Sequence, residues 1–482
     1  MRSHSRREML FNTLYGVGGL TLAAQMPGGG IFATPALADT FVDPLSPKQP
    51  HFPPKVDSVI WLHMDGAPST LDLYDYKPEL IKLAGTEPPA SFLNGIKTST
   101  QGGVGKLFAS NRSWKQYGDS GAWFSDLLPN IAQHADKLTF IKSSTTIGAT
   151  HDISILKLNT GDLRPGRPSL GAWVTYALGS ANRDLPAYVV LYAGKKEPRA
   201  GSVNWNSGFL PAVYQGVAFR PGPSPILDLA HPELMGLTEQ RDDLDLLRRL
   251  NAQEGAEHPE NTELQARLRS YELAYRMEEA APEAVDVSKE SDATKSLYGL
   301  NDPTTKEYGT ILLRARRLVE RKVRFIQIVS GELEAAGNGE ARSWDAHQDL
   351  EINHGAHAKS VDKPIAGLLT DLKQRGLLDR TLVVWTSEFG RTSYGQSGNG
   401  RDHNPWGYTQ WLAGGGVKAG TTFGETDEIG LQSQGKKVDT YDLHATVLQQ
   451  LGLDHLKTIY KHDGRSERPT VVYGAVVEEL LA

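Results

Sequence analysis

The sequence contains no cysteine among its 482 residues. Disulfide bonds, thiolate zinc sites, iron–sulfur clusters and cysteine nucleophiles are therefore excluded. The sequence also has little excess of either charge, because 51 basic residues stand against 57 acidic residues, for a net charge of -6. No long basic stripe is present, so we do not expect a nucleic-acid partner. What remains is a globular composition, with 39% hydrophobic and 22% charged residues.

The N-terminal segment lacks a hydrophobic run long enough to cross a membrane, which takes about 20 apolar residues. Instead, Arg6 and Arg7 precede a weakly apolar, glycine-containing stretch at 11–24, and small residues at 36–38 offer a cleavage site. We interpret residues 1–38 as a twin-arginine signal peptide. We therefore expect the twin-arginine machinery to export residues 39–482 to the periplasm or the cell exterior. We expect no integral membrane span in that mature chain.

Short, largely apolar runs recur along the mature chain. They lie at 59–62, 138–141, 188–191, 325–329, 382–385 and 410–413. Apolar runs without alternation are typical of strands that are covered on both faces. The stretch 360–375 has apolar residues at helical spacing and is followed by Gly376, as a helix end requires. Strands that alternate with helices predict an α/β fold with a mostly parallel sheet.

Residues 225–320 differ from the rest, because they are rich in Glu, Arg, Leu and Gln and show few strand signals. Leucines recur there at helical spacing, which predicts a helical insertion. Within it, we expect residues 280–304 to form a polar connecting loop.

Acidic residues and histidines gather where the expected strands end. In an open α/β sheet, ligands bind outside the carboxyl ends of the strands. The residues placed there are Asp65, Asp72, His151, Asp345, His347, Glu388, Asp402 and His403. A single histidine or aspartate in a loop is commonly a hydrogen-bonded residue or a helix cap. Their recurrence at several strand ends instead favours a site for one or two divalent ions, Zn²⁺, Ca²⁺ or Mn²⁺.

Several motifs resemble those of the exported bacterial family known as domain of unknown function (DUF) 1501. The resemblance covers about 54–482 and is carried by Gly-Ala-Pro-Ser-Thr-Leu-Asp at 66–72, Trp-Asp-Ala-His at 344–347, Glu-Phe-Gly-Arg-Thr at 388–392 and Gly-Arg-Asp-His at 400–403. That family is placed in the alkaline-phosphatase and sulfatase superfamily, whose members hydrolyse phosphate or sulfate esters with one or two divalent metals. The resemblance implies a three-layer α/β domain over 39–482.

The resemblance also implies a set of metal ligands. It assigns this role to Asp65 or Asp72, to Asp345 with His347, to Glu388 and to His403. Phe389 stands where the superfamily pattern has a histidine. One ligand of a second metal is therefore expected to be missing.

The attacking group is not fixed by a motif. The absence of cysteine and of any Ser-x-Pro-x-Arg segment excludes the formylglycine mechanism of sulfatases. The sulfatase spacing, counted back ten residues from Gly161, reaches His151, which is a candidate nucleophile, general base or metal ligand. Thr150 and Ser69 are the hydroxyl alternatives.

Two arginine candidates follow the fifth strand. Arg391 and Arg401 could hold an anionic ester through paired hydrogen bonds, or they could form ion pairs with Glu388 or Asp402 that serve only the fold.

Two functions are consistent with these residues. The first is an exported, metal-dependent hydrolase of phosphate or sulfate esters, with an anionic ester or a polysaccharide as substrate. The second is a non-catalytic exported binding or assembly protein that keeps the fold and has lost the chemistry. The placement of acidic residues and histidines at the strand ends favours the first function, whereas Phe389 and the missing nucleophile motif support the second.

Overall fold

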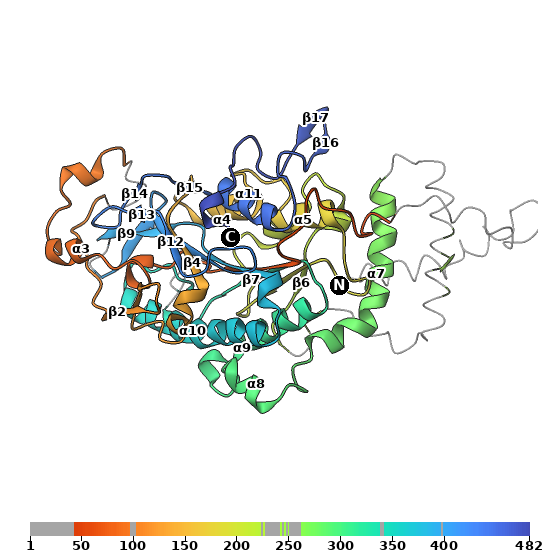
Figure 1. The fold of residues 1–482 in the computed structure, drawn as a ribbon, viewed down its shortest axis with the longest axis horizontal. Helices are drawn as coiled ribbons and strands as arrows, with labels where there is room; N and C mark the ends of the chain where they lie inside the picture. Colours follow the sequence, from red (N-terminus) through yellow and green to blue (C-terminus); the bar gives the residue numbers. More distant parts are fainter. Residues whose placement is uncertain are drawn as a thin grey trace, which may run out of the picture. The chain divides into compact units, whose positions relative to one another are not determined.

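A mostly parallel sheet of nine strands organises the chain (Figure 1). Its order is β12-β4-β11-β8-β1-β7-β5-β6, and β15 pairs with β4. The strands are β1 (Ser58–His63), β4 (Leu138–Thr145), β5 (Tyr188–Tyr192), β6 (Val217–Phe219), β7 (Phe325–Val329), β8 (Thr381–Thr386), β11 (Tyr408–Gly414), β12 (Thr421–Phe423) and β15 (Val438–Asp439). Strand β11 is antiparallel to β4 and β8, and the other pairings in this sheet are parallel. The predicted α/β fold is confirmed.

The computed structural model describes residues 43–96, 103–222, 225–226, 242, 245–246, 249, 262–337, 342–396 and 399–482. Residues 1–38, where the signal peptide is predicted, lie outside these ranges. So does most of 225–261, the first part of the predicted insertion. Within the described ranges, none of the helices is both long enough and apolar enough to cross a bilayer.

Helices cover both faces of the sheet, which gives three layers (Figure 1). On one face lie α7 (Thr262–Val285), α9 (Pro303–Glu320) and α10 (Leu350–Gln374); on the other lie α4 (His151–Thr160), α5 (Leu170–Leu178) and α11 (Thr440–Gln450). The side chains of strand β1 show why both faces are covered. Ile60 and Leu62 pack into the core under α7, α9 and α10, whereas Val59 and Trp61 pack into the core under α4, α5 and α11. Because side chains alternate across a strand, a strand buried on both faces must be apolar throughout.

Two helical expectations need correction. The helix predicted at 360–375 begins ten residues earlier, at Leu350, directly after Asp349, whose backbone is left-handed (φ 52°). The loop predicted at 280–304 is largely helical. Helix α7 continues to Val285, and α8 (Asp292–Leu297) follows, with the Ser291 side chain accepting a hydrogen bond from the Thr294 backbone N–H. The short polar side chains read as loop signals are helix caps.

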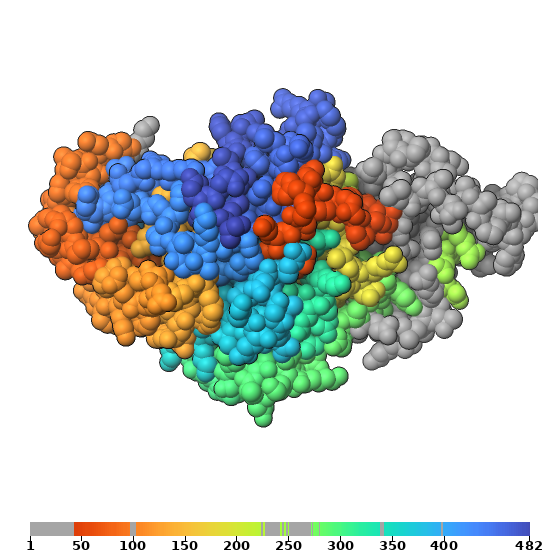
Figure 2. Space-filling model, in the orientation of Figure 1, coloured from red at the N-terminus to blue at the C-terminus, as the bar shows by residue number. Residues whose placement is uncertain are grey.

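Smaller two-stranded sheets complete the fold. They are formed by β2 (Trp114–Tyr117) with β3 (Ala122–Ser125), β9 (Gly390–Gly395) with β10 (Arg401–Asn404), β13 (Glu425–Thr426) with β14 (Ser433–Gln434), and β16 (Tyr460–His462) with β17 (Arg465–Glu467). A short helix, α3 (Pro78–Leu83), follows the first strand. The backbone N–H groups of Lys55 and Val56 both donate to the Gln450 carbonyl at the end of α11. Figure 2 shows the N-terminal segment, in red, lying against the C-terminal part of the chain, in blue.

Candidate active site

Three adjacent parallel strands, β8, β1 and β7, end at the same edge of the sheet. His63 is the last residue of β1, and it is in register with Thr386 of β8 and Val329 of β7. The turns that follow these strands carry Asp65, Glu388 and, further along the chain, Asp345. Parallel pairing therefore brings together ligands that are far apart in the sequence.

The first group of ligands consists of His151, Asp345 and His403, all buried. His151 Nε2 lies 3.0 Å from Asp345 Oδ2, and His403 Nε2 lies 3.3 Å from Asp345 Oδ1. His347 lies beside this group, with its Nε2 2.9 Å from Asp345 Oδ1 and 3.0 Å from His403 Nε2. Its side chain is 29% exposed, so His347 marks the side of the group that solvent reaches.

The second group consists of His63, Asp65 and Glu388, which are also buried. His63 Nε2 lies 3.0 Å from Glu388 Oε2, and the Gly66 backbone N–H donates to Glu388 Oε1 at 3.0 Å. Asp65 Oδ1 is buried and has no hydrogen-bond partner among the described residues. A buried carboxylate oxygen without a partner is costly, and a cation would satisfy it.

His151 connects the two groups. Its Nδ1 lies 2.6 Å from Glu388 Oε1, while its Nε2 faces Asp345. Burial opposes a charge on His151, but the two carboxylates that flank the ring raise its pKa. An imidazole that turns one nitrogen to a ligand group and the other to a carboxylate has the usual environment of a metal-bound histidine.

The carboxylates of the site experience opposing effects. Burial raises the pKa of Asp345, but the Arg391 guanidinium and the surrounding histidines hold it well below its usual range. Burial likewise raises the pKa of Glu388, and hydrogen bonds from His151 and His63 bring it below normal. Burial and the charge of Glu388 leave the pKa of Asp65 raised. Clustered carboxylates and imidazoles of this kind fit a divalent cation, and they fit Zn²⁺ or Mn²⁺ by donor type.

The structure brings together Asp65, His151, Asp345, His347, Glu388 and His403 from the predicted ligand set, and it places Asp72 and Ser69 elsewhere. Asp72 pairs with Arg401, whose Nε donates to Asp72 Oδ2 at 2.8 Å. The Ser69 hydroxyl also donates to Asp72, and the Ser69 backbone N–H donates to His354 Nε2 at 2.8 Å. Asp72 thus neutralises a buried arginine, and the Ser69 hydroxyl is committed to it.

Asp402 and Thr150 also lie outside both groups. Asp402 precedes His403 on β10, and its Oδ1 accepts the His403 backbone N–H at 2.7 Å. The pairing of β10 with β9 is irregular between Arg401 and His403, and burial raises the pKa of Asp402, so this carboxyl lies buried beside the first group without belonging to it. Thr150 is exposed at the N-terminus of α4, directly before His151, and its hydroxyl makes no capping hydrogen bond.

Arg391 is fully buried and serves the fold. Its Nε donates to the Ala67 carbonyl at 2.8 Å, and its Nη2 donates to Asp345 Oδ1 at 2.7 Å and to the Gly66 carbonyl. With 0% of its side chain exposed, it cannot also hold a substrate ester. The structural alternative for Arg391 is therefore favoured, although its carboxylate partner is Asp345 and not Glu388.

His63 is a candidate ligand that was not predicted from the sequence. Phe389, which replaces the expected histidine, is buried, and its ring centroid lies 4.9 Å from that of His151 and 4.5 Å from that of His403. The second group nevertheless contains an imidazole, because β1 supplies His63. The signal was the spacing of His63 and Asp65, since residues two apart in an extended chain face the same way.

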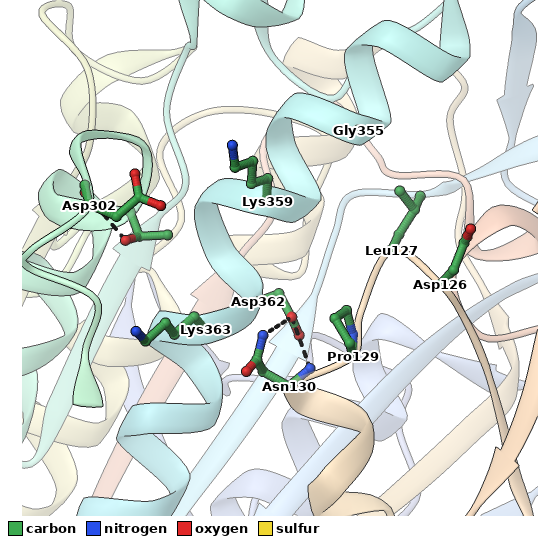
Figure 3. A pocket seen from close by; sticks show the side chains of 10 residues that line it. Asp126, Leu127, Pro129, Asn130, Asp302, Gly355, Lys359, Asp362 and Lys363 are labelled. Carbon is green, nitrogen blue, oxygen red and sulfur yellow. Dashed lines mark hydrogen bonds between the residues drawn. The ribbon is translucent and has the colours of Figure 1, made fainter. Parts of the chain in front are cut away.

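A cavity of about 340 Å³ has none of the residues of the two groups in its lining. Figure 3 shows the side chains that line it. Asp362 of α10 lines it, but both oxygens of that carboxylate accept hydrogen bonds, at 2.9 Å from the Asn130 backbone N–H and at 2.7 Å from that of Ile131. Lys359 and Lys363 of α10 are exposed at its rim. The two groups of candidate metal ligands lie at the carboxyl edge of the sheet and not in this cavity.

One protein family, described as protein of unknown function (DUF1501), matches residues 56–481. No protein with a curated function matches this chain by sequence. Its structure is similar to that of a sulfatase from Pseudoalteromonas sp., with 15% identity, 89% of this chain and 74% of that chain covered, and a TM-score of 0.35. It is also similar to an alkaline phosphatase from the Antarctic bacterium TAB5 (12% identity, 78% and 96% covered, TM-score 0.34) and to a phosphonate monoester hydrolase from Silicibacter pomeroyi (14%, 73% and 73%, 0.32).

Proposed function

The chain belongs to the DUF1501 family, whose function is unknown, and we propose that it is a metal-dependent hydrolase of phosphate or sulfate esters. The observation that carries this proposal is the pair of adjoining ligand groups at the carboxyl edge of the sheet. A divalent ion bound by such ligands supplies Lewis-acid polarisation of an ester oxygen. The substrate is an anionic ester, borne by a polysaccharide or another extracellular polymer.

We assign the residues of the site to two roles, ion binding and nucleophilic attack. His151, Asp345 and His403 would hold one ion, with His347 on the exposed side, and His63, Asp65 and Glu388 would hold the other. The Thr150 hydroxyl is the candidate nucleophile, because the Ser69 hydroxyl is bonded to Asp72 and both nitrogens of His151 face carboxylates. Thr150 stands at the N-terminus of α4, where the helix dipole favours developing negative charge on its oxygen.

The test combines metal content with ester hydrolysis. We expect the folded, mature protein, purified without chelator, to hold divalent metal by elemental mass spectrometry and to cleave aryl phosphates or aryl sulfates. His403→Ala should lose metal and activity together. Thr150→Val should keep the metal and lose at least about 10³-fold in rate, as removal of a nucleophile does.

The matched control is His444→Gln. His444 is also a buried histidine, but its Nε2 bonds to the Leu158 carbonyl, at 2.9 Å, outside both ligand groups. This variant should keep metal and activity. Absence of metal from the wild type would refute the hydrolase and leave the non-catalytic binding protein as the function. If Thr150→Val keeps its metal and hydrolyses esters at the wild-type rate, the nucleophile is a group other than Thr150.

We also propose that the protein is exported by the twin-arginine pathway, which rests on Arg6 and Arg7 and the segment that follows. Changing both residues to lysine should leave the protein in the cytoplasm, whereas the unchanged chain should accumulate outside it. Cell fractionation with immunoblotting measures this difference. Export of the double-lysine variant at the wild-type level would contradict the proposed route.

A further inference from the structure

One arginine reaches the candidate site from its solvent side. Arg199 lies in the loop after β5, and its Nη2 is 3.4 Å from Asp345 Oδ2. Its side chain is 25% exposed, whereas those of Arg391 and Arg401 are 0% exposed. Of the three guanidinium groups, Arg199 is thus the one that a ligand from solvent can contact.

The position of Arg199 follows from the sheet. Strand β5 is parallel to β7, with Tyr192 in register with Val329, and Val329 is in register with His63. The loop after β5 therefore leaves the sheet at the edge where both ligand groups lie. Burial and the charge of Glu388 raise the pKa of Asp65, and the Arg199 charge is among those that lower it, so Arg199 acts on the second group as well as the first.

The contact of Arg199 with Asp345 is the looser of two arginine contacts on that carboxylate. The Arg391 Nη2 lies 2.7 Å from Asp345 Oδ1, against 3.4 Å for the Arg199 contact with Oδ2. Asp345 also has His151 and His347 within 3.0 Å. If Arg199 turned to a ligand, Asp345 would keep these partners, so no buried charge would be left uncompensated.

We propose that Arg199 is the anion-binding residue of this site, and that its guanidinium holds the phosphate or sulfate group of the ester. This inference rests on the proposed function. The planar guanidinium offers paired N–H donors that match two oxygens of a tetrahedral oxyanion. The site would then select esters whose phosphate or sulfate group keeps a negative charge, and it would discriminate against uncharged esters.

The test measures binding of inorganic phosphate and of sulfate to the metal-loaded, full mature protein by isothermal titration calorimetry. Arg199→Ala should raise the dissociation constant of each anion about 10- to 100-fold, as loss of a charge-assisted hydrogen bond does. Arg199→Lys should recover part of the loss, since it keeps the charge without the fork. Metal content should stay at the wild-type level in both variants, whereas a residue that only positions Asp345 would alter it.

Lys195→Ala is the matched control. Lys195 is on the same loop, but its side chain is 91% exposed and pairs with Glu334 at 3.4 Å. This variant should bind the anions as the wild type does. Equal binding by Arg199→Ala and wild type would overturn the role of Arg199 and leave the hydrolase standing. Failure of the metal-loaded wild type to bind either anion would also overturn the role of Arg199, whereas the hydrolase would be refuted only by absence of metal or of ester hydrolysis.

Discussion

Replacement of Glu388 by glutamine is expected to abolish ion binding by the second group. It should also lower the ion affinity of the first group about 10- to 100-fold. Glu388 Oε2 faces His63, while Oε1 faces His151 Nδ1 at 2.6 Å and accepts the Gly66 N–H. Glutamine has one acceptor oxygen and one amide donor, so it cannot accept on both sides. Elemental mass spectrometry and competition with a calibrated chelator would measure the two losses, and ester hydrolysis should fall in parallel.

The control for this prediction is His63→Ala. His63 belongs to the second group and contacts Glu388 but not Asp345, so its removal should release the second ion and leave the first in place. Retention of both ions by Glu388→Gln would show that this carboxylate is not shared between the groups. Loss of both ions in His63→Ala would show that they do not bind separately.

Replacement of Asp72 by alanine is expected to lower the free energy of unfolding by about 3–5 kcal/mol and to leave the metal content unchanged. Asp72 is 2% exposed and its partner Arg401 is 0% exposed, so the variant would leave a buried guanidinium charge without its carboxylate. Urea denaturation of the metal-loaded mature chain measures the loss. Burial raises the pKa of Asp72, but Arg401 holds it below its usual value. The contribution of the pair is therefore present above about pH 4 and is lost as the pH falls.

Asp57→Ala serves as the comparison for Asp72→Ala. Asp57 also pairs with an arginine, Arg380, but the two side chains are 56% and 47% exposed. Its loss should cost less than about 1 kcal/mol, because solvent screens the pair. If Asp72→Ala instead released metal at unchanged stability, Asp72 would be a ligand, as the sequence analysis allowed.

The fold could be predicted because its buried strands are marked in the sequence by short apolar runs. Val59 to Leu62 are all apolar, and a run with no polar position requires cover on both faces, which in turn requires helices. The start of α10 was not predicted, since the regular apolar spacing that indicated the helix begins only at Val361, whereas the helix begins at Leu350. Helix ends respond to tertiary contacts more than the apolar pattern does.

The candidate site was partly predictable for a related reason. Asp65 and Asp72 follow the same strand and have the same chemistry, so their sequence positions could not separate them. What separates them is Arg401, 329 residues further on, which pairs with Asp72 and leaves Asp65 to the second group. Arg199 carried no signal at all, because only the parallel pairing of β5 with β7 brings its loop to this edge.

The ligands of the two groups are drawn from β1 at residue 63 to β10 at residue 403. No fragment that ends before His403 can complete the first group, and no fragment that begins after His63 can complete the second. During synthesis the ribosome must therefore deliver most of the polypeptide before either ion finds its full set of donors. If the two groups hold the proposed ions, metal acquisition is a late event in the life of each molecule, and the free-ion concentrations of the compartment where the chain folds would decide which metal it carries.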